Sequence, residues 1–352
     1  MDSARGWRGG QNQVLLTAQG MARRGHEVVV ACQRGGVLAE RARAAGLDVR
    51  AQRFAGDLSP AAWLSLRRLL ARERFDAVQL HDPHALAAGV LAARGAPRVP
   101  LVATRRVDFP LNGRWSRWKY RSAARVVAVS EAIRQVLARD GVDGHRMRLV
   151  YEGVPDRPPA PGGREALAGL GVPEGAPVIG NVAALTGHKD HATLLQAARL
   201  VLDRAPHARF VIVGEGELRA RIEAQHRELR LGQGCVLAGF RTDLDRLLPA
   251  FSIFCLSSHM EGLGTSLLDA MAFARPVVAT RAGGIPEAVE DGVTGRVVPA
   301  RDPQALAAAL LDVLGDDQRR QAMGRAGRRR FEERFTADRM VEGTLAVYAE
   351  LP

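Results

Sequence analysis

The sequence predicts an α/β protein with two doubly wound domains, each built around a mostly parallel sheet. Its 352 residues exceed one ordinary domain and give each of two domains enough chain for its own core. Short runs of β-branched residues alternate with helical stretches along almost the whole chain. A segment rich in proline and glycine separates the two halves.

The predicted strands fall into two sets. In the first half they cover residues 26–32, 47–53, 76–81, 99–105 and 125–130, and in the second half residues 177–183, 208–214, 235–240, 252–258 and 276–280. Strand, helix and strand at this spacing predict parallel βαβ units. Several of the strands are apolar throughout, as expected where helices cover both faces of a sheet.

The segment 154–163, VPDRPPAPGG, is interpreted as the linker. Its four prolines and two glycines are incompatible with a helix or a central strand. We therefore expect an N-terminal domain over residues 1–155 and a second domain over 163–332. Doubly wound sheets bind ligands at the carboxyl ends of their strands, so a ligand cleft is expected between the domains.

The start of the chain has an unusual order of elements. A glycine-containing loop runs into a predicted helix at about residues 11–24 and then into a strand. A loop of this kind normally follows a first strand, but only four residues precede Arg5. Either the first strand is absent or the chain starts late, and the sequence leaves both alternatives open.

The charge of the chain is concentrated in its first half. Residues 1–160 hold 27 Lys+Arg and 14 Asp+Glu, whereas residues 161–352 hold 23 and 24. A basic half indicates a nucleic acid, an anionic membrane or an anionic substrate as the partner. Only two of the 50 cations are lysines, Lys119 and Lys189. Either they mark places where a compact ammonium is needed, or their positions are a matter of chance.

Several features predict a cytoplasmic protein. The first residues are polar and lack the apolar region of a signal peptide, and no apolar run approaches the roughly 18 residues of a membrane span. The three cysteines, Cys32, Cys235 and Cys255, form no CxxC pair and are expected to be buried thiols.

The stretch 257–272, SSHMEGLGTSLLDAMA, combines acids, glycines and a helix start. It follows a predicted buried strand, so the helix N-terminus is expected at the carboxyl edge of the sheet, where free N–H groups and the dipole attract phosphate. Gly262 and Gly264 allow a ligand to approach the backbone closely. Glu261 suits sugar hydroxyls, and Asp269 suits the two hydroxyls of a ribose.

Asp269 lies four residues after Thr265 and therefore on the same helix face. One ligand with a sugar, a diphosphate and a ribose would account for the whole stretch. The alternative makes Thr265 or Ser266 an N-cap and Asp269 a solvated helix residue, and this stretch alone leaves both open.

Four other stretches of the chain can be compared, together with this motif, with the segments of a known protein family. They are IGNVAALTGHKDHATLLQA (179–197), FVIVGEGEL (210–218), RPVVATRAGGIPEAVEDGVTGRVVPARDPQALAAAL (275–310) and WRGGQNQ (7–13). These stretches follow the family's order along nearly the whole chain. With them and with an E-x7-E-like pair at Glu261 and Asp269, the chain resembles the retaining glycosyltransferases of the GT-B fold known as family 4. The resemblance implies two Rossmann-like domains and a C-terminal helix, residues 333–352, that returns to the N-terminal domain.

The resemblance also implies roles for single residues. Lys189 corresponds to the lysine on the donor diphosphate, and Glu261 to the acid on the donor sugar. The other implied donor-binding positions are Gly9 and Gly10 against the phosphate, Gly262, Leu263, Gly264 and Thr265 along the sugar and phosphate, Asp269 at the ribose, and Gly239, Phe240 and Arg241 around the base.

The chain departs from the family pattern at some positions. The second acid is Asp269 instead of glutamate, and Ala184 stands where the family often has an arginine, with His188 beside the lysine. Arg106 occupies the place of a histidine that many relatives carry near the reacting sugar carbon. His81 is the alternative, so the candidate catalytic residues are Glu261, Lys189, His81 and Arg106.

The stretch 114–121, RWSRWKYR, interleaves basic and aromatic residues. It is either an amphipathic patch on an anionic membrane or a solvated helix with packed tryptophans. The first alternative, together with the basic N-terminal half, favours an anionic acceptor such as a lipid-linked or lipopolysaccharide-core glycan and a peripheral place on the inner face of the cytoplasmic membrane.

The expected function is therefore a metal-independent, retaining hexosyltransferase that needs no cofactor and uses a UDP-, GDP- or ADP-sugar in the biosynthesis of a cell-envelope glycan. No DxD pair is placed for a metal. One alternative is a sugar-nucleotide epimerase of the GT-B fold. A basic nucleic-acid-binding protein is the other, but the dispersed arginines and the lack of a nucleic-acid motif argue against it.

Overall fold

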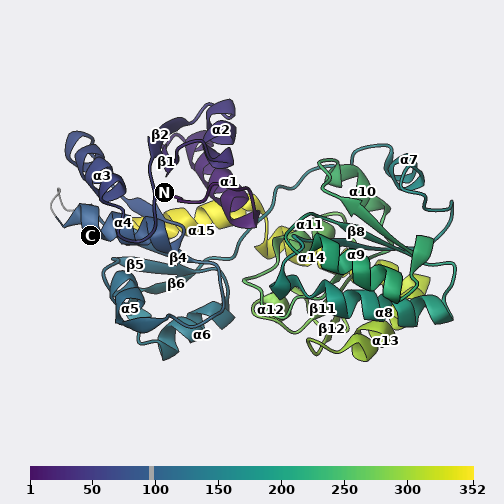
Figure 1. Cartoon of the computed structure of the whole chain (residues 1–352). Helices are drawn as coiled ribbons and strands as arrows, with labels where there is room; N and C mark the ends of the chain where they lie inside the picture. The colour runs from purple at the N-terminus through teal and green to yellow at the C-terminus, as the bar shows by residue number, and fades with distance from the viewer. Residues whose placement is uncertain (95–98) are drawn as a thin grey trace. The chain divides into compact units, whose positions relative to one another are not determined.

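The computed structural model of the chain describes residues 1–94 and 99–352. The chain forms two compact units (Figure 1). Met1–Val154 and Ala337–Pro352 make the N-terminal unit, and Pro155–Thr336 makes the C-terminal unit. Both units are α/β with parallel strand pairing among the described residues, as predicted.

The C-terminal unit contains one six-stranded parallel sheet in the order β12-β11-β10-β7-β8-β9. Its strands are β7 (Val178–Val182), β8 (Arg209–Val213), β9 (Cys235–Gly239), β10 (Ile253–Leu256), β11 (Val277–Thr280) and β12 (Gly295–Val298). Numbered within this unit, the order is 3-2-1-4-5-6, that of a dinucleotide-type doubly wound sheet. Strand order therefore reverses between β7 and β10, which is the switch point of the sheet.

Helices follow most of these strands and cover the sheet. They are α7 (Gly163–Ala168), η2 (Gly187–Lys189), α8 (His191–Arg204), α9 (Arg219–Glu228), η3 (Gly232–Gly234), α10 (Leu244–Ala250), α11 (Thr265–Ala272), α12 (Ile285–Ala288), α13 (Pro303–Leu314) and α14 (Asp317–Arg334).

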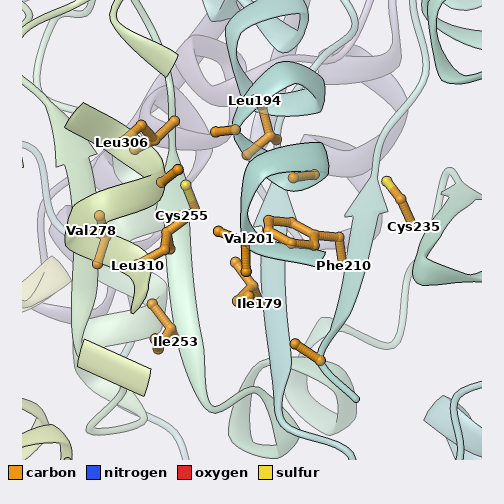
Figure 2. Close-up of a cluster of buried hydrophobic side chains, with 14 of the residues drawn as sticks. Ile179, Leu194, Val201, Phe210, Cys235, Ile253, Cys255, Val278, Leu306 and Leu310 are labelled. Atoms are coloured by element: carbon orange, nitrogen blue, oxygen red, sulfur yellow. The ribbon is translucent and has the colours of Figure 1, made fainter. Parts of the chain in front are cut away.

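The core of this unit holds the central strands in place. Figure 2 shows apolar side chains of β7, β8, β10 and β11 meeting those of α8 and α13, with Phe210, Leu194 and Leu310 among them. These three side chains are at most 1% exposed. Because the strands are apolar on this face and helices cover them, the loops at the carboxyl edge extend from a rigid base.

The N-terminal unit has two sheets, β1-β2 and β3-β4-β5-β6. The strands are β1 (Val29–Gln33), β2 (Asp48–Gln52), β3 (Val78–Leu80), β4 (Leu101–Arg105), β5 (Arg125–Ala128) and β6 (Met147–Leu149). The helices are α1 (Gly9–Arg23), α2 (Val37–Ala44), α3 (Pro60–Arg72), α4 (Pro83–Ala93), α5 (Gly113–Arg121), α6 (Glu131–Arg139), η1 (Gly144–Arg146) and α15 (Ala337–Ala349).

The first residues of the chain lie between these two sheets. The Met1 ammonium donates to the carbonyl of Gln79 at 2.6 Å. The N–H of Asp2 donates to the carbonyl of Ala31 at 3.1 Å, and Asp2 forms a parallel bridge with Cys32. Among the described residues, Met1 and Asp2 therefore occupy the place of a first strand, with one isolated bridge in place of a full strand.

The last helix, α15, packs on α1 inside the N-terminal unit (Figure 1). The hydroxyl of Thr17 on α1 contacts the sulfur of Met340 at 3.8 Å. A Cβ built at Gly20 would lie 2.4 Å from Val341 Cγ2, so glycine allows the two helices to approach closely. The hydroxyl of Tyr348 donates to Gln79 Oε1 at 2.9 Å and ties α15 to the edge of the sheet.

Some sequence predictions need correction. β6 and β12 were not predicted as strands, and α1 begins at Gly9 instead of at about residue 11. The glycines 9 and 10 thus belong to the first helical turn and not to a loop before it. The prediction of buried free thiols is confirmed for all three cysteines. Within residues 1–94 and 99–352, no helix is both long and apolar enough to cross a membrane.

Candidate active site

Lys189 and Glu261 meet at the switch point of the C-terminal sheet. Lys189 ends η2, in the loop after β7, and Glu261 lies in the loop after β10. Their atoms Nζ and Oε2 are 2.5 Å apart, and the side chains are 16% and 12% exposed. Ligands of doubly wound sheets bind at this place, so an ion pair with little solvent around it marks a site where charge is stabilised.

The two loops are tied to each other by further hydrogen bonds. The hydroxyl of Ser258 donates to Glu261 Oε2 at 3.1 Å, and that of Ser257 donates to the carbonyl of Lys189 at 2.9 Å. The N–H of His259 donates to the carbonyl of His188 at 2.9 Å. These contacts fix Glu261 and Lys189 before any ligand binds, which is the preorganisation that electrostatic catalysis requires.

The N-terminus of α11 opens beside Glu261. Its N-cap is Gly264, with φ +88°, and no side chain caps the helix. The alternative that Thr265 or Ser266 is the N-cap is therefore wrong, because both residues already lie in the helix. The left-handed backbone angle of Gly264 favours glycine, and a Cβ there would in addition lie 2.8 Å from Leu267 Cδ2.

The remaining loop residues support this helix start. The N–H of Gly284, in the loop after β11, donates to the carbonyl of Gly262 at 3.2 Å. Leu263 is fully buried. Its side chain therefore anchors the loop in the core, and only its backbone can contact a ligand.

Asp269 lies one turn into α11 and is about one-fifth exposed, with Oδ1 3.6 Å from Nη2 of Arg157. Burial raises the pKa of this carboxyl to about 6, although the nearby guanidinium lowers it in part. Asp269 is therefore largely ionised at neutral pH but titrates far closer to neutrality than an ordinary aspartate.

The ends of β8 and β9 form the other side of the switch-point region. Gly214 has φ +151°, and a Cβ there would lie 1.9 Å from the carbonyl oxygen of Ala183. Its N–H donates to the carbonyl of Gly239 at 2.8 Å. Phe240 is 63% exposed. The guanidinium of Arg241 is held by Asp243 at 2.8 and 2.6 Å, so this arginine is already engaged.

His81 and Arg106 form one cluster in the N-terminal unit. Arg106 Nη1 lies 3.0 Å from His81 Nδ1, and Arg106 Nε donates to Glu152 Oε1 at 2.9 Å. Burial and the adjacent guanidinium hold the pKa of His81 well below 6.5, so the imidazole is neutral. Gly10 lies against this cluster, since a Cβ there would be 3.9 Å from Arg106 Cδ.

Three residues that lie near the predicted site residues were not predicted from the sequence. Glu152 carries the charge that balances Arg106, and Ser258 orients Glu261. His191 follows the lysine loop directly, is 3% exposed, and has no hydrogen-bond partner for either ring nitrogen in the described part of the chain. Burial and the adjacent Lys189 lower the pKa of His191 to about 4. The repeated histidines in GHKDH were the available signal for His191.

The structure explains why two lysines stand out among the arginines. Lys119 is 2% exposed and pairs with Asp57 at 2.5 Å, while Lys189 pairs with Glu261 at the same distance. Both ammonium groups thus occupy confined sites that suit a compact cation better than a planar guanidinium. No group of three or more possible metal-binding side chains occurs among residues 1–94 and 99–352.

Comparison with known proteins identifies the family. The family described as "Glycosyltransferase Family 4" matches residues 7–157, and the one described as "Glycosyl transferases group 1" matches residues 164–330. The chain belongs to the family 4 glycosyltransferases of the GT-B fold. The predicted family and fold class are thereby confirmed.

Curated relatives of this glycosyltransferase family member are about one-third identical to it over the aligned residues. The alpha-maltose-1-phosphate synthase of Mycolicibacterium smegmatis is 33% identical over 67% of this chain and 66% of its own length. The D-inositol 3-phosphate glycosyltransferase of Geodermatophilus obscurus is 32% identical over 79% and 62%. The O-antigen chain mannosyltransferase C of Escherichia coli is 35% identical over 43% of each chain. The chain thus spans less than two thirds of the length of each of these relatives.

Solved structures share the fold at lower identity. Anabaena HepE in complex with UDP and glucose has a TM-score of 0.86 and 21% identity, with 99% of both chains covered. A glycosyltransferase from Rickettsia africae has the same TM-score at 19% identity, covering 99% of this chain and 97% of its own. These likenesses establish that the family member has the GT-B fold.

Proposed function

We propose that this chain is a retaining glycosyltransferase that moves a sugar from a nucleotide-sugar donor to an acceptor. The observation that carries the proposal is the Lys189–Glu261 ion pair, 2.5 Å long, at the switch point and beside the N-terminus of α11. A cation, a carboxylate and a helix start at one place match the phosphate and sugar parts of such a donor.

In this proposal, Lys189 and the N-terminus of α11 stabilise the leaving group. The nucleoside diphosphate gains negative charge as the bond to the sugar breaks, and the ammonium and the helix start stabilise that charge. Without ligand, Glu261 neutralises Lys189. The diphosphate takes over this role when the donor binds, and Glu261 then accepts hydrogen bonds from hydroxyls of the sugar.

The donor is proposed to be a UDP-, GDP- or ADP-sugar that needs neither a metal nor another cofactor, because fixed groups of the protein supply the positive charge. The HepE structure with UDP supports a uridine nucleotide as the first choice. Gly239, Phe240 and Arg241 are proposed to contact the base, where the exposed ring of Phe240 offers a stacking surface. Asp269 is proposed to contact the ribose, and Gly9 and Gly10 the phosphate.

Retention of configuration places the acceptor on the side of the leaving group, so no protein nucleophile is assigned. The cluster of Arg106, His81 and Glu152 is proposed to act near the reacting carbon. His81 is neutral and Arg106 is ion-paired, so this cluster can orient polar groups of a substrate without adding net charge.

The acceptor is proposed to be a glycan of the cell envelope, lipid-linked or part of a lipopolysaccharide core, reached from the cytoplasm. The O-antigen mannosyltransferase among the relatives supports an envelope glycan. Trp115 on α5 and the nearby Phe109 are 37% and 46% exposed in a segment rich in arginine, which supports peripheral contact with an anionic membrane. Sedimentation with anionic and with neutral vesicles tests this contact.

The activity is tested with purified protein, EDTA, a panel of nucleotide sugars and candidate acceptors. We expect acceptor-dependent release of nucleoside diphosphate and a product with the anomeric configuration of the donor by NMR. Conversion of the donor into another nucleotide sugar without an acceptor would support an epimerase instead. Inversion of configuration would contradict the retaining mechanism, and salt-dependent DNA binding alone would support the nucleic-acid alternative.

A further inference from the structure

The carboxylate of Asp57 joins three segments of the N-terminal unit. Asp57 lies between β2 and α3, His84 lies in the first turn of α4 after β3, and Trp115 and Lys119 lie on α5 after β4. All three segments follow the carboxyl ends of strands that pair in parallel. Because α/β sheets bind ligands outside the carboxyl ends of their strands, the place where these segments meet is a candidate ligand site.

Three side chains hold the carboxylate of Asp57 in one position. Its Oδ2 accepts from Lys119 Nζ at 2.5 Å and from Trp115 Nε1 at 2.8 Å, and its Oδ1 lies 2.6 Å from His84 Nδ1. Lys119 is 2% exposed and also donates to the carbonyl of Pro83 at 3.1 Å. Burial alone would raise the pKa of Asp57, but the three hydrogen bonds hold it below its ordinary value, so the carboxylate is ionised.

His84 presents one ring nitrogen to a ligand. An ionised carboxylate only accepts hydrogen bonds, so the proton between His84 and Asp57 is assigned to His84 Nδ1. The N–H of His84 donates to Oδ1 of Asp82, the N-cap of α4, at 2.9 Å. Ring and backbone are thus both fixed, and the side chain is 54% exposed. Nε2, on the far side of the ring from Asp57, is therefore available for a hydrogen bond with a hydroxyl group.

Trp115 presents part of an apolar ring beside this nitrogen. Its N–H is used by Asp57, and its ring stacks on Trp118 with the centroids 4.7 Å apart. The residue nevertheless remains 37% exposed. An apolar ring fixed in contact with water costs free energy until something covers it. Because Trp115 and His84 bond the two oxygens of one carboxylate, the open part of the indole and the imidazole lie close together.

A fixed aromatic ring beside a hydrogen-bonding nitrogen suits a sugar ring. A hexopyranose has C–H groups that pack on an aromatic ring and hydroxyls that need hydrogen-bond partners. An acyl chain would leave the imidazole unused. An anion would gain little here, because the ion pair of Lys119 and Asp57 carries no net charge. The cluster therefore favours a neutral sugar ring.

We propose that His84 and Trp115, held in place by Asp57, bind a neutral sugar ring of the acceptor. His84 Nε2 exchanges a hydrogen bond with a hydroxyl of this sugar, and the indole packs on its C–H groups. The segments that carry these two residues also carry His81 and Arg106, the groups proposed to act near the reacting carbon. Asp57 is a positioning residue. The acceptor role rests on the proposed transferase activity.

His84→Ala tests the site by kinetics. It removes an exposed side chain, so the Tm should stay at the wild-type value. The KM for the acceptor should rise at least ~10-fold while the KM for the donor stays unchanged, because only a contact with the acceptor is lost. His84→Gln places an amide near the position of Nε2 and should restore part of the affinity. The matched control is His145→Ala, an exposed histidine just before β6, at the other edge of the sheet, and it should change neither KM.

Sugar binding is also measured without any transfer. The indole N–H signal of Trp115, one of four tryptophans, is assigned by its loss in Trp115→Phe. It is followed by ¹H–¹⁵N NMR while methyl α-glucoside, methyl α-galactoside or methyl α-mannoside is added. At least one of these neutral sugars should shift the signal in a saturable way in wild type and in His145→Ala. His84→Ala should need at least ~10-fold more of the same sugar.

A wild-type acceptor KM for His84→Ala would overturn the proposal, and so would an indole signal that none of the three glycosides shifts. If Trp115→Ala weakens sedimentation with anionic vesicles while His84→Ala alters neither acceptor KM nor glycoside binding, this surface contacts a membrane and not a sugar. A lower Tm for His84→Ala with an unchanged acceptor KM would reduce the cluster to a tie between loops. Glycoside binding without transfer from any donor would contradict the proposed function but support the sugar site.

Discussion

Lys189 is the residue on which the proposed chemistry depends most. Lys189→Ala removes the ammonium that faces the leaving diphosphate, and we expect kcat/KM to fall by about 100-fold or more, equivalent to roughly 3 kcal/mol. The fold should persist, because the side chain lies in a loop at the edge of the sheet. Steady-state kinetics and the circular dichroism spectrum measure both. The matched control is Arg204→Ala, a substitution of an exposed residue at the end of α8. A wild-type kcat/KM for Lys189→Ala would contradict the proposed role of this lysine.

The two acids of the motif are expected to differ in importance. Glu261→Gln should lower kcat by a factor that corresponds to roughly 2–4 kcal/mol, because this carboxylate is proposed to contact the sugar that reacts. Asp269→Asn should mainly raise KM for the donor, since it is proposed to contact the ribose. Both changes keep the size of the side chain. Equal losses of kcat in the two variants would contradict this division.

Asp269 should also make stability depend on pH. Its pKa is about 6 in the folded chain against 3.8 for an ordinary aspartate, so the folded state holds its proton to higher pH than the unfolded state does. The contribution of Asp269 to stability is therefore fully present below about pH 4 and is lost as pH rises through about 6, by an amount on the order of 2–3 kcal/mol. Asp269→Asn should equal wild type near pH 4 and be more stable at pH 8. Denaturant unfolding at both values tests this, and a difference that does not change with pH would contradict it.

At the level of residues, the sequence predicts which side chains are candidates for the site better than it predicts their surroundings in the folded protein. The motif and its spacing suffice to single out Lys189 and Glu261 as candidates. They cannot reveal that Glu152 balances Arg106, because 46 residues separate the two in the chain and only the fold brings them together. They also cannot reveal the raised pKa of Asp269, which depends on the desolvation that packing of α11 creates.

Among the elements, the contact between α1 and α15 is tight enough to be tested by one substitution. A Cβ at Gly20 would lie 2.4 Å from Val341 Cγ2, so Gly20→Leu must push α15 away. We expect a loss of about 3 kcal/mol in the stability of the N-terminal unit. Gly144→Ala is the control, since its Cβ would meet no atom within 4 Å. Thermal unfolding measures both, and an unchanged Tm for Gly20→Leu would show that the helices do not pack as described.

Two strands at the ends of their sheets, β6 and β12, were not predicted from the sequence. β6 and β12 are three and four residues long and lie at the ends of their sheets. A short edge strand lacks the continuous apolar run that reveals a central strand, and β6 includes Arg148. The start of α1 was placed two residues late because Gly9 and Gly10 have low helix propensity. In the structure, the N–H of Arg8 donates to Gln11 Oε1 at 3.2 Å, which supports a helix start at Gly9.

At the scale of the whole molecule, the two-domain architecture follows from the alternation of strands and helices and from the proline-rich segment. The boundaries proposed from the sequence are 1–155, 163–332 and 333–352. In the structure, one compact unit consists of Met1–Val154 and Ala337–Pro352, and the other consists of Pro155–Thr336. Residues 337–352 join the first unit because Met340 and Val347 pack in one buried cluster with valines 102, 127 and 150, and Leu16 of α1 packs against that cluster. Helical periodicity alone could not reveal this return, since it does not say which surface an amphipathic helix covers.

The central claim is that a nucleotide-sugar donor binds at Lys189 and the N-terminus of α11. The most direct test is a thermal-shift titration of UDP-, GDP- and ADP-sugars in EDTA, with wild type, Lys189→Ala and the Arg204→Ala control. One donor class should raise the Tm of wild type and of the control, because ligand at 100 times Kd adds about 2.7 kcal/mol of stability. Lys189→Ala should need at least ~10-fold more donor for the same shift, about 1.4 kcal/mol of lost binding. No shift with any donor, or the same shift in Lys189→Ala, would contradict the claim.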